Sequence, residues 1–496
     1  MNFIKSVSLL VSFLIFSQTQ ANVQSHFDQI KNDPNALYEF FKLMPKGGEL
    51  HYHLAGSVYP ETMLEIASKS NYCIDKKTFA VTNSSSGSCE GIPIKELFDQ
   101  PELYEKTVRS WSLKAFTPGE ESAHDHFFNA FFKFGTLVFD YRPELVADII
   151  KRAANQNEQY LELMIIPDNA HSLSFGALLK DASSFAQKRK LLLANEDFQK
   201  NNEYTVTEAD NILQQARKNL GCDTNPQQKN CQVTIKFLYY SLREQPLDNL
   251  FAQTLNAFEA VAKSQQRQKN SLVGVNLVQA ENGIFALRDY LKQMQIYQYL
   301  HQIYPQVNIT LHAGELTQEL VVPEELNYHI HDALMTGQAQ RIGHGVTIAH
   351  EENVNAILNY MAKQHIPVEI NLSSNQKILN VSGRNHPLNY YLAHHVPIVL
   401  STDDEGVLRT TLTAQYVEAV MDHNLDYPTL KQINRNVLTY AFVPGKSIWA
   451  NAEKALLVKE CQDLKSNTCK KFIKDNEKAR LQWELEVKLN DFESIY

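Results

Sequence analysis

Three features that would assign this sequence to a special class are missing from it. After the first 21 residues there is no apolar run of about 18 residues, so we expect no membrane anchor. Basic residues are not in excess: 47 Lys and Arg stand against 56 Asp and Glu, a net charge of −9, which argues against nucleic acid and anionic membranes as partners. Cysteine is scarce, with six residues and no Cys-x-x-Cys, the spacing typical of zinc and redox sites.

What remains is an ordinary globular composition. Of the 496 residues, 44% are hydrophobic and 21% are charged. A chain of this length can bury a sizeable core, as one large α/β domain or as two smaller ones.

The N-terminal residues have the pattern of a signal peptide. Lys5 provides a positive start, Val7 to Phe16 an apolar core, and Thr19-Gln20-Ala21 a small-residue cleavage site. The apolar core is too short to span a bilayer permanently. We therefore predict that residues 1–21 are removed and that the mature chain is exported, to the periplasm or to the medium.

The six cysteines occur as close neighbours along the chain, and three local disulfides are the simplest pairing. Sequence alone leaves about 15 connectivities open, besides free buried thiols or a cysteine zinc site. Exported chains retain disulfides, which favours the local pairing. The predicted pairs are Cys73 with Cys89, Cys222 with Cys231, and Cys461 with Cys469.

Eight apolar, β-rich segments recur along the chain, and the stretches between the later ones have helical periodicity. Strand alternating with helix in this way predicts an α/β fold, a (β/α)8 barrel of the TIM type. The two longest intervals, about 70–120 and 170–232, are expected to be disulfide-bearing insertions into a single barrel spanning residues 22–496. The segments are Glu49–Gly56, Tyr160–Pro167, Val233–Ser241, Leu272–Gln279, Val307–Glu315, Arg341–Gly345, Val368–Ser374 and Pro397–Asp404.

Two of these segments carry histidines at spacings that suit a metal site. Residues i and i+2 of a strand point to the same side, so His51 and His53 can converge on one ion, although two solvent-facing histidines on an edge strand are an equally simple interpretation. His312 and Glu315 end another strand and offer an imidazole ligand and a free carboxylate. Alone, that pair is more often a strand-end histidine beside a solvated acid.

A barrel brings these strand ends together, because the carboxyl ends of its strands form one rim where catalytic residues collect. His344 ends the sixth segment, and Asp403 and Asp404 end the eighth. Closure places the eighth strand beside the first, so we expect three imidazoles and one carboxylate to surround a single zinc ion.

The motifs resemble those of the adenosine and AMP deaminase family, within the amidohydrolase superfamily of zinc barrels. They appear in the family's order over about residues 44–440. They are His-x-His-Leu-x-Gly at 51–56, His-Ala-Gly-Glu at 312–315, Arg-Ile-Gly-His-Gly at 341–345 and Ser-Thr-Asp-Asp at 401–404.

The resemblance implies a role for each residue of these motifs. Glu315 would protonate the purine ring nitrogen, His344 would orient the attacking hydroxide, and Asp404 would accept a hydrogen bond at the imidazole side of the purine. Gly56 and Gln279 are the further positions expected beside the substrate. The zinc ligands, for one ion per chain, would be His51, His53, His312 and Asp403. The fourth segment lacks the lysine whose carbamate bridges two ions in other amidohydrolases.

Three positions depart from the family's pattern, and all of them concern the grip on the substrate. Ala55 stands where an aspartate usually holds the ribose 5′-hydroxyl, Gln279 where a glycine meets the purine, and Glu405 where a proline follows. The chemistry is therefore predicted more firmly than the nucleoside.

The leading hypothesis is zinc-dependent deamination of adenosine or 2′-deoxyadenosine to the inosine product and ammonia, with a small purine nucleoside as partner. A second hypothesis keeps the site but changes the substrate to adenine or a 5′-modified adenosine. A third is a non-catalytic extracellular binding protein. The sequence does not indicate an oligomeric state.

Overall fold

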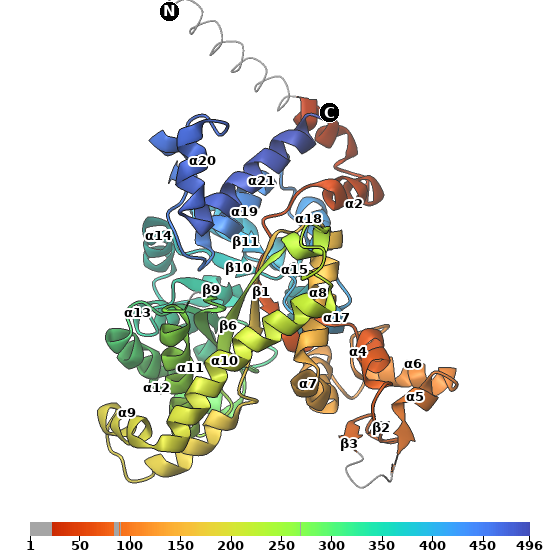
Figure 1. Cartoon of the computed structure of the whole chain (residues 1–496), viewed down its shortest axis with the longest axis vertical. Coiled ribbons are helices and arrows are strands. Elements are labelled where there is room, and N and C mark those ends of the chain that lie inside the picture. Colours follow the sequence, from red (N-terminus) through yellow and green to blue (C-terminus); the bar gives the residue numbers. More distant parts are fainter. Residues whose placement is uncertain (1–21, 84–88, 90, 268) are drawn as a thin grey trace, which may run out of the picture.

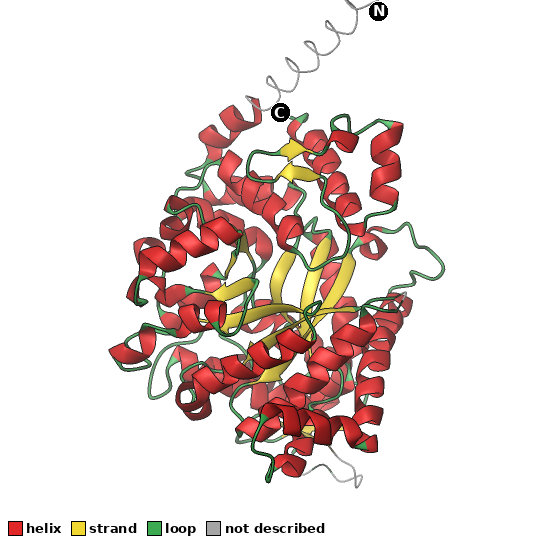
Figure 2. Ribbon diagram, turned by 90° about the vertical axis from the view of Figure 1, so that its left-hand side faces the viewer, coloured by secondary structure: helices red, strands yellow, loops and turns green. Residues whose placement is uncertain are grey.

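The structure, a computed structural model, describes residues 22–83, 89, 91–267 and 269–496. The proposed signal peptide lies outside the described residues. Eight parallel strands form one sheet in the order β1-β5-β6-β7-β8-β9-β10-β11, with helices around it (Figures 1 and 2). These strands are β1 Glu49–His53, β5 Tyr160–Ile165, β6 Thr234–Leu242, β7 Leu272–Val278, β8 Asn308–Ala313, β9 Arg341–His344, β10 Val368–Ile370 and β11 Ile398–Leu400.

The two edge strands, β1 and β11, meet and nearly close the sheet into a barrel. Tyr52 and Asp403 form a parallel bridge, in which the His53 amide donates to the Asp403 carbonyl at 2.9 Å. The Ser401 hydroxyl accepts from the amide of His51 at 3.2 Å. The (β/α)8 barrel predicted from the sequence is thereby confirmed.

All eight predicted segments contain a strand, but most strands end earlier than expected. The reason is that short helices begin at the rim: α3 (Leu54–Ser57) follows β1 directly, and α15 (Leu372–Leu379) starts two residues after β10. The motif residues therefore lie at strand ends and in the first turns beyond them.

The helices that cover the barrel are amphipathic or buried. Between consecutive strands from β6 onward they are α11 Leu247–Ser264, α12 Ile284–Ile303, η3 Pro323–Leu326, α13 His329–Met335, η4 Val346–His350, α14 Val354–Gln364, α15, η5 Gly383–Asn385 and α16 Leu388–Ala393. After β11 come α17 Glu405–Leu408, α18 Leu412–Met421 and α19 Tyr427–Tyr440, and α2 (Pro34–Leu43) precedes β1.

The segment between β1 and β5 carries a small antiparallel sheet in the order β3-β2-β4, away from the barrel (Figure 1). A disulfide joins Cys73 and Cys89 there. Its elements are α4 Pro60–Ala67, β2 Tyr72–Ile74, β3 Val81–Asn83, β4 Ile92–Pro93, α5 Ile94–Leu97, α6 Pro101–Ser110, α7 Ala123–Asp140 and α8 Arg142–Asn155.

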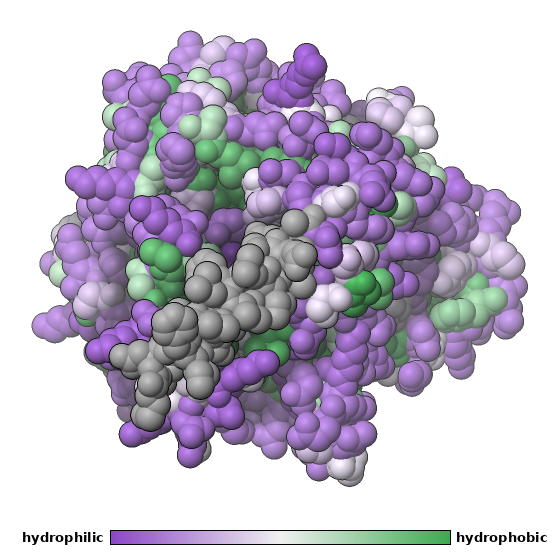
Figure 3. All heavy atoms as spheres, turned by 90° about the horizontal axis from the view of Figure 1, so that it is seen from above, coloured by the Kyte–Doolittle hydropathy of each residue, from purple (hydrophilic) through white to green (hydrophobic). Residues whose placement is uncertain are grey.

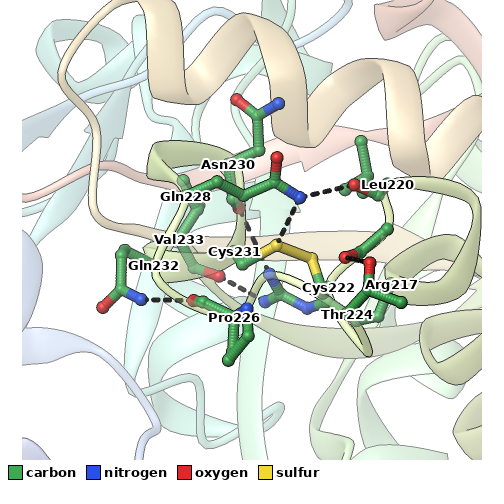
Figure 4. The surroundings of a disulfide bond; sticks show 11 residues. Arg217, Leu220, Cys222, Thr224, Pro226, Gln228, Asn230, Cys231, Gln232 and Val233 are labelled. Carbon is green, nitrogen blue, oxygen red and sulfur yellow. Dashed lines mark hydrogen bonds between the residues drawn. A yellow bond between two sulfur atoms is a disulfide. The ribbon is translucent and has the colours of Figure 1, made fainter.

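The segment between β5 and β6 is helical, with η1 His171–Leu179, α9 Phe185–Ala194, α10 Glu196–Asn219 and η2 Lys229–Gln232. Its disulfide, Cys222–Cys231, closes the turn after α10 (Figure 4). Gln228 donates to the Leu220 carbonyl at 2.5 Å, and the Arg217 guanidinium donates to the Asn230 carbonyl at 3.3 Å, so the turn is tied to the helix on both sides.

The C-terminal residues form a separate small hydrophobic cluster around the third disulfide, Cys461–Cys469. The elements are β12 Trp449–Asn451, β13 Leu456–Leu457, η6 Lys459–Cys461, α20 Asn467–Lys474 and α21 Glu477–Glu493. All three predicted disulfides are thus confirmed.

Hydrophilic side chains predominate on the face shown in Figure 3. Over the described ranges, no helix combines the length and the apolar character that crossing a membrane requires.

Candidate active site

The carboxyl ends of four barrel strands, β1, β8, β9 and β11, bring the histidines and carboxylates of the sequence motifs into one buried cluster. Each of these side chains is at most 9% exposed. The cluster consists of His51, His53, His312, Glu315, His344, Asp403 and Asp404.

Three imidazoles and one carboxylate of this cluster face a common point. His53 Nε2 lies 3.2 Å from His312 Nε2. Asp403 Oδ1 lies 3.3 Å from His51 Nε2 and 3.2 Å from His53 Nε2. Over the described part of the chain, His51 Nε2 is buried without a hydrogen-bond partner.

The outer partners of these rings determine which nitrogen faces inward with a lone pair. Oδ1 of Asn276 lies 3.1 Å from Nδ1 of His312, and the Glu369 carboxylate lies 2.7 Å from Nδ1 of His51. Because these oxygens accept, both rings carry their proton on Nδ1 and direct an Nε2 lone pair at the common point. Lone pairs facing each other in a buried site repel unless a cation lies between them, so the residues fit a metal ion.

The charge balance at this point also favours a cation. Burial opposes the charged form of His51, but the nearby Asp403 and Glu369 carboxylates outweigh that effect and raise the pKa of His51 to about 9. A positive charge, whether a proton or a metal ion, is therefore favoured on the Nε2 side of this ring. Burial also acts on Asp403, where the surrounding histidines prevail and hold the pKa well below its usual value. The Ser374 hydroxyl donates to the second Asp403 oxygen at 2.8 Å and fixes the carboxylate.

His344 lies at the edge of the cluster. The potential ligand atoms of His51, His312, His344 and Asp403 lie within 4.8 Å of one another, and so do those of His53, Asp403 and Asp404. His344 Nε2 is 3.9 Å from Asp403 Oδ2, farther than the nitrogens of His51 and His53 are from Oδ1. Its Nδ1 is occupied by the Asn375 amide at 3.0 Å.

Glu315 is held beside the cluster by its backbone. Gly314 turns the chain with a φ of 76°, a conformation that glycine adopts without strain. The Glu281 carboxylate accepts from the amides of Gly314 at 3.0 Å and Glu315 at 2.7 Å. Burial, together with Asp403 and Glu281, raises the pKa of Glu315 well above its usual value, so its carboxyl group retains a proton.

Glu281 itself is ionised, so it can accept both of these amides. Burial alone would raise its pKa, but His329, 2.6 Å away, and the Arg243 guanidinium lower it to about 2. Two neighbouring carboxyl groups thus have opposite protonation, a pattern typical of acid–base sites.

Asp404 is packed against Gly56. A Cβ atom at Gly56 would lie 1.9 Å from Asp404 Oδ1, so only glycine fits there. Burial and the neighbouring Asp403 raise the pKa of Asp404 well above its usual value.

Gln279, expected beside the substrate in place of a glycine, keeps a glycine-like backbone. Its φ is 91°, in the left-handed region that L-residues rarely adopt. The side chain is turned away to the preceding strand end, where its Oε1 accepts from the Glu244 amide at 2.9 Å.

Glu405 does not fit the expected role in substrate grip. It is 1% exposed and forms an ion pair with the Arg152 guanidinium and a hydrogen bond with the Tyr52 hydroxyl. Glu405 joins the first turn of α17 to Arg152 of α8 and Tyr52 of β1, because a buried carboxylate requires such partners.

Four residues of the site were missed from the sequence: Asn276, Glu281, Glu369 and Ser374. Two of them had a signal, since Asn276 and Glu369 interrupt apolar strands with a polar side chain. An inward-facing polar residue in a barrel strand has to bond something in the interior.

A cavity of about 990 Å³ lies elsewhere, at the opposite end of the barrel. Its lining includes Asn270, Asn308 and Gln340, which precede or begin strands, and none of the clustered residues. It is separate from the candidate site.

Comparison with known proteins identifies the family. The family model described as adenosine deaminase matches residues 139–455. The chain belongs to the adenosine deaminase family. Among similar adenosine deaminases, that of Vibrio parahaemolyticus is 32% identical over 158 residues, or 32% of this chain and 42% of that protein. That of Vibrio cholerae is 30% identical over 195 residues, or 39% of this chain and 51% of that protein.

The chain thus spans about half or less of the length of these adenosine deaminases.

Solved structures support the fold. The arabidopsis protein ADAL complexed with IMP has a TM-score of 0.54 at 18% identity, covering 92% of this chain and 99% of that one. Adenine deaminase from Arthrobacter aurescens has a TM-score of 0.53 at 17% identity, covering 83% of this chain and 96% of that one.

Proposed function

We propose that this protein is a metal-dependent hydrolase that removes the amino group of an aminopurine, with adenosine or 2′-deoxyadenosine as the first candidates. The observation that carries the proposal is geometric: a buried Glu315 lies 3.5 Å from His344, beside imidazole nitrogens and a carboxylate that face one point. The raised pKa of Glu315 agrees with its role as an acid. Family membership supports the same class of reaction.

The cofactor in this proposal is one Zn²⁺ ion held by His51, His53, His312 and Asp403. Neutral imidazole and carboxylate are ligands that zinc prefers, and the bonds from Nδ1 to Glu369 and Asn276 orient two of the rings for it. When bound, the metal supplies an activated water at neutral pH.

The protein's own side chains then handle the protons. Glu315 donates to the ring nitrogen beside the carbon under attack, so the ring accepts the electron pair as the water oxygen adds. His344 orients the attacking oxygen. Collapse of the adduct breaks the carbon–nitrogen bond and leaves a carbonyl on the purine. One proton of the attacking water passes to the amine, which leaves as ammonia, and the other returns Glu315 to its acid form.

Asp404 grips the imidazole side of the purine. From the sequence we expected Asp404 to accept this hydrogen bond. Because N7 of a purine is an acceptor and the pKa of Asp404 is raised well above its usual value, we propose that Asp404 donates the bond instead. Gly56 has no Cβ atom and so leaves room for the Asp404 carboxyl group.

A second substrate class follows from Ala55, which offers no polar group for a ribose 5′-hydroxyl. Adenine itself or a 5′-modified adenosine suits the same chemistry. Structural neighbours that include an adenine deaminase and a protein complexed with IMP motivate testing both.

The test is ammonia release by the mature, zinc-loaded protein from adenosine, 2′-deoxyadenosine, adenine and 5′-substituted adenosines. Metal content is measured in parallel by mass spectrometry. We expect one zinc per chain and turnover of at least one substrate. Zinc-loaded protein that releases no ammonia from any of them would overturn the proposal.

We further propose that the chain is exported and cleaved after Ala21. The three disulfides support an oxidising compartment. N-terminal sequencing of the protein from culture medium and periplasm tests this, and an intact N-terminus in the cytoplasm contradicts it.

A further inference from the structure

A chain of buried hydrogen bonds leads from His344 away from the buried cluster of the candidate active site. His344 Nδ1 lies 3.0 Å from Asn375 Nδ2, and Asn375 Oδ1 lies 3.0 Å from His386 Nε2. At the far end, the backbone amide of Leu388 donates to His386 Nδ1 at 3.1 Å. All three side chains are at most 3% exposed.

The local structure explains why the chain ends on Leu388. Leu388 is the first residue of α16, and the first amides of a helix have no partner within it. Pro387, the residue before it, has no N–H to offer. The Leu388 amide is therefore free to turn back to the ring of His386.

This amide determines the direction of every bond in the chain. A backbone N–H can only donate, so His386 Nδ1 accepts and its proton is on Nε2. The Asn375 oxygen then accepts from His386, and the Asn375 NH₂ group donates to His344 Nδ1. His344 is left with its proton on Nε2.

Protonation of His386 would remove the acceptor at Nδ1 for the Leu388 amide, since both ring nitrogens would then donate. Burial first, and then the neighbouring His423 and His344, lower the pKa of His386 to about 3. The ring of His423 lies 5.5 Å away, and within the described ranges no carboxylate forms a hydrogen bond or ion pair with His386.

Of the other groups around His344, the Asp403 carboxylate, 3.9 Å from Nε2, favours a proton on the same nitrogen but is beyond hydrogen-bond distance, and two further groups do not favour it. Asn371 Nδ2 is 3.5 Å from both ring nitrogens. Glu315 Oε1 is 3.5 Å from Nδ1, and an ionised carboxylate at that place would favour a proton on Nδ1 instead of Nε2. The chain through Asn375 opposes that shift.

We propose that Asn375 and His386 are positioning residues that hold His344 with its proton on Nε2, as a hydrogen-bond donor to the attacking oxygen. The inference rests on the proposed function and deepens it, because it assigns His344 a donor role and leaves it no lone pair on Nε2 with which to act as a base. Both residues act through His344, since Asn375 contacts it directly and His386 contacts Asn375.

The test reverses the bond to His344 with a side chain of nearly the same shape. Asn375→Asp places acceptor oxygens at both ends, so it should move the His344 proton to Nδ1. The matched control is Asn380→Asp, the same substitution at the exposed end of the same helix. The tautomer is read from ¹⁵N chemical shifts of the zinc-loaded, histidine-labelled protein, with His344→Gln to assign the signal.

We expect Asn375→Asp to shift the His344 signal to the Nδ1–H pattern. It should lower kcat by about 10²- to 10⁴-fold, the range between loss of an outer partner and loss of the correct tautomer, with KM changed less than about threefold and zinc retained. Asn380→Asp should match the wild type. An unchanged His344 signal, or unchanged kcat with the signal shifted, overturns the proposal.

A second pair of variants tests His386 independently of Asn375. His386→Gln retains an N–H donor for Asn375, whereas His386→Leu removes it, so the glutamine variant should retain several-fold more turnover than the leucine variant. Equal kcat values with equal folding overturn the proposal. If the wild type deaminates no purine, the proposed function fails, while the ¹⁵N pattern still tests the chain.

Discussion

Two layers of the barrel interior contain buried charges, and they differ in how fully those charges are paired. In the lower layer, Arg341 donates to Glu369 at 2.6 Å, to Glu162 at 2.7 Å and to the Tyr440 carbonyl at 3.0 Å. At the rim above, His51 Nε2 and Asp404 Oδ1 have no partner among the described residues. A structural network is expected to be fully paired, and unpartnered ligand-type atoms that face one point are expected where a ligand binds.

Glu369 connects the two layers. One oxygen accepts from Arg341 and from the Thr310 hydroxyl at 3.0 Å, and the other lies 2.7 Å from His51 Nδ1. Thr310 stands two residues before His312 on β8, so both side chains face the barrel interior. The structural layer thus orients the rim above it.

The largest expected effect is at the rim. Glu315→Gln removes the only proton that the proposed reaction takes from a side chain, so kcat should fall by about 10² to 10⁴-fold while zinc remains bound. Steady-state kinetics with metal analysis measures this. Glu319→Gln, an exposed acid in the following loop, is the control and should be neutral. Turnover above a tenth of the wild type would remove Glu315 from the mechanism.

Next comes the lower layer. Arg341→Met leaves Glu162 and Glu369 as buried, uncompensated carboxylates, so the free energy of unfolding should drop by about 3 to 5 kcal/mol. Urea denaturation checks this. Arg480→Met breaks a partly exposed pair with Glu484 and should cost less than about 1 kcal/mol. Equal losses in both variants would erase the contrast between the layers.

A change at Glu369 tests the connection between them. Glu369→Gln weakens the acceptor behind His51, so zinc affinity should fall by about 10- to 100-fold. Competition with a chelator gives the affinity, and Glu352→Gln on the surface serves as control. Unaltered affinity would mean that the two layers are independent.

Lys478 gives a pH-dependent test at the lower end of the barrel. Burial lowers the pKa of Lys478 from 10.5 to about 8, and the neighbouring Glu162 and Arg341 have smaller effects. The charged form is therefore disfavoured in the folded state, a cost that is complete below pH 8 and disappears as pH rises through 10.5.

Lys478→Met should accordingly stabilise the protein by on the order of 2 kcal/mol at pH 7, with the gain shrinking above pH 8. Denaturation at pH 7, 9 and 10.5 follows this. If the two proteins differ in unfolding free energy by the same amount at all three pH values, the charge of the Lys478 ammonium group is not the cause of the stabilisation.

The smallest effect concerns substrate grip. Ala55→Asp should raise kcat/KM for adenosine by up to about tenfold, the value of one hydrogen bond, and leave adenine unaffected. A lower rate for adenosine would indicate that the pocket holds the ribose in another way.

Local patterns in the sequence predicted the barrel and the residues that meet at the rim, and they favoured the disulfide pairing that the structure has. Strand periodicity, cysteine spacing and histidines two apart are properties of neighbours along the chain, and closure of a parallel barrel has one geometry. For this reason His51, His53, His312 and Asp403 were predicted together although some 350 residues separate their ends.

Only the tertiary structure decided which partners these residues have. Glu369 behind His51, Asn276 behind His312 and the chain from Leu388 to His344 join segments with no common pattern. The same holds for Glu405, which the sequence placed at the substrate and the fold committed to Arg152. A side chain's type sets what it can bond, but its protonation, tautomer and role depend on what burial brings within 3 Å of it.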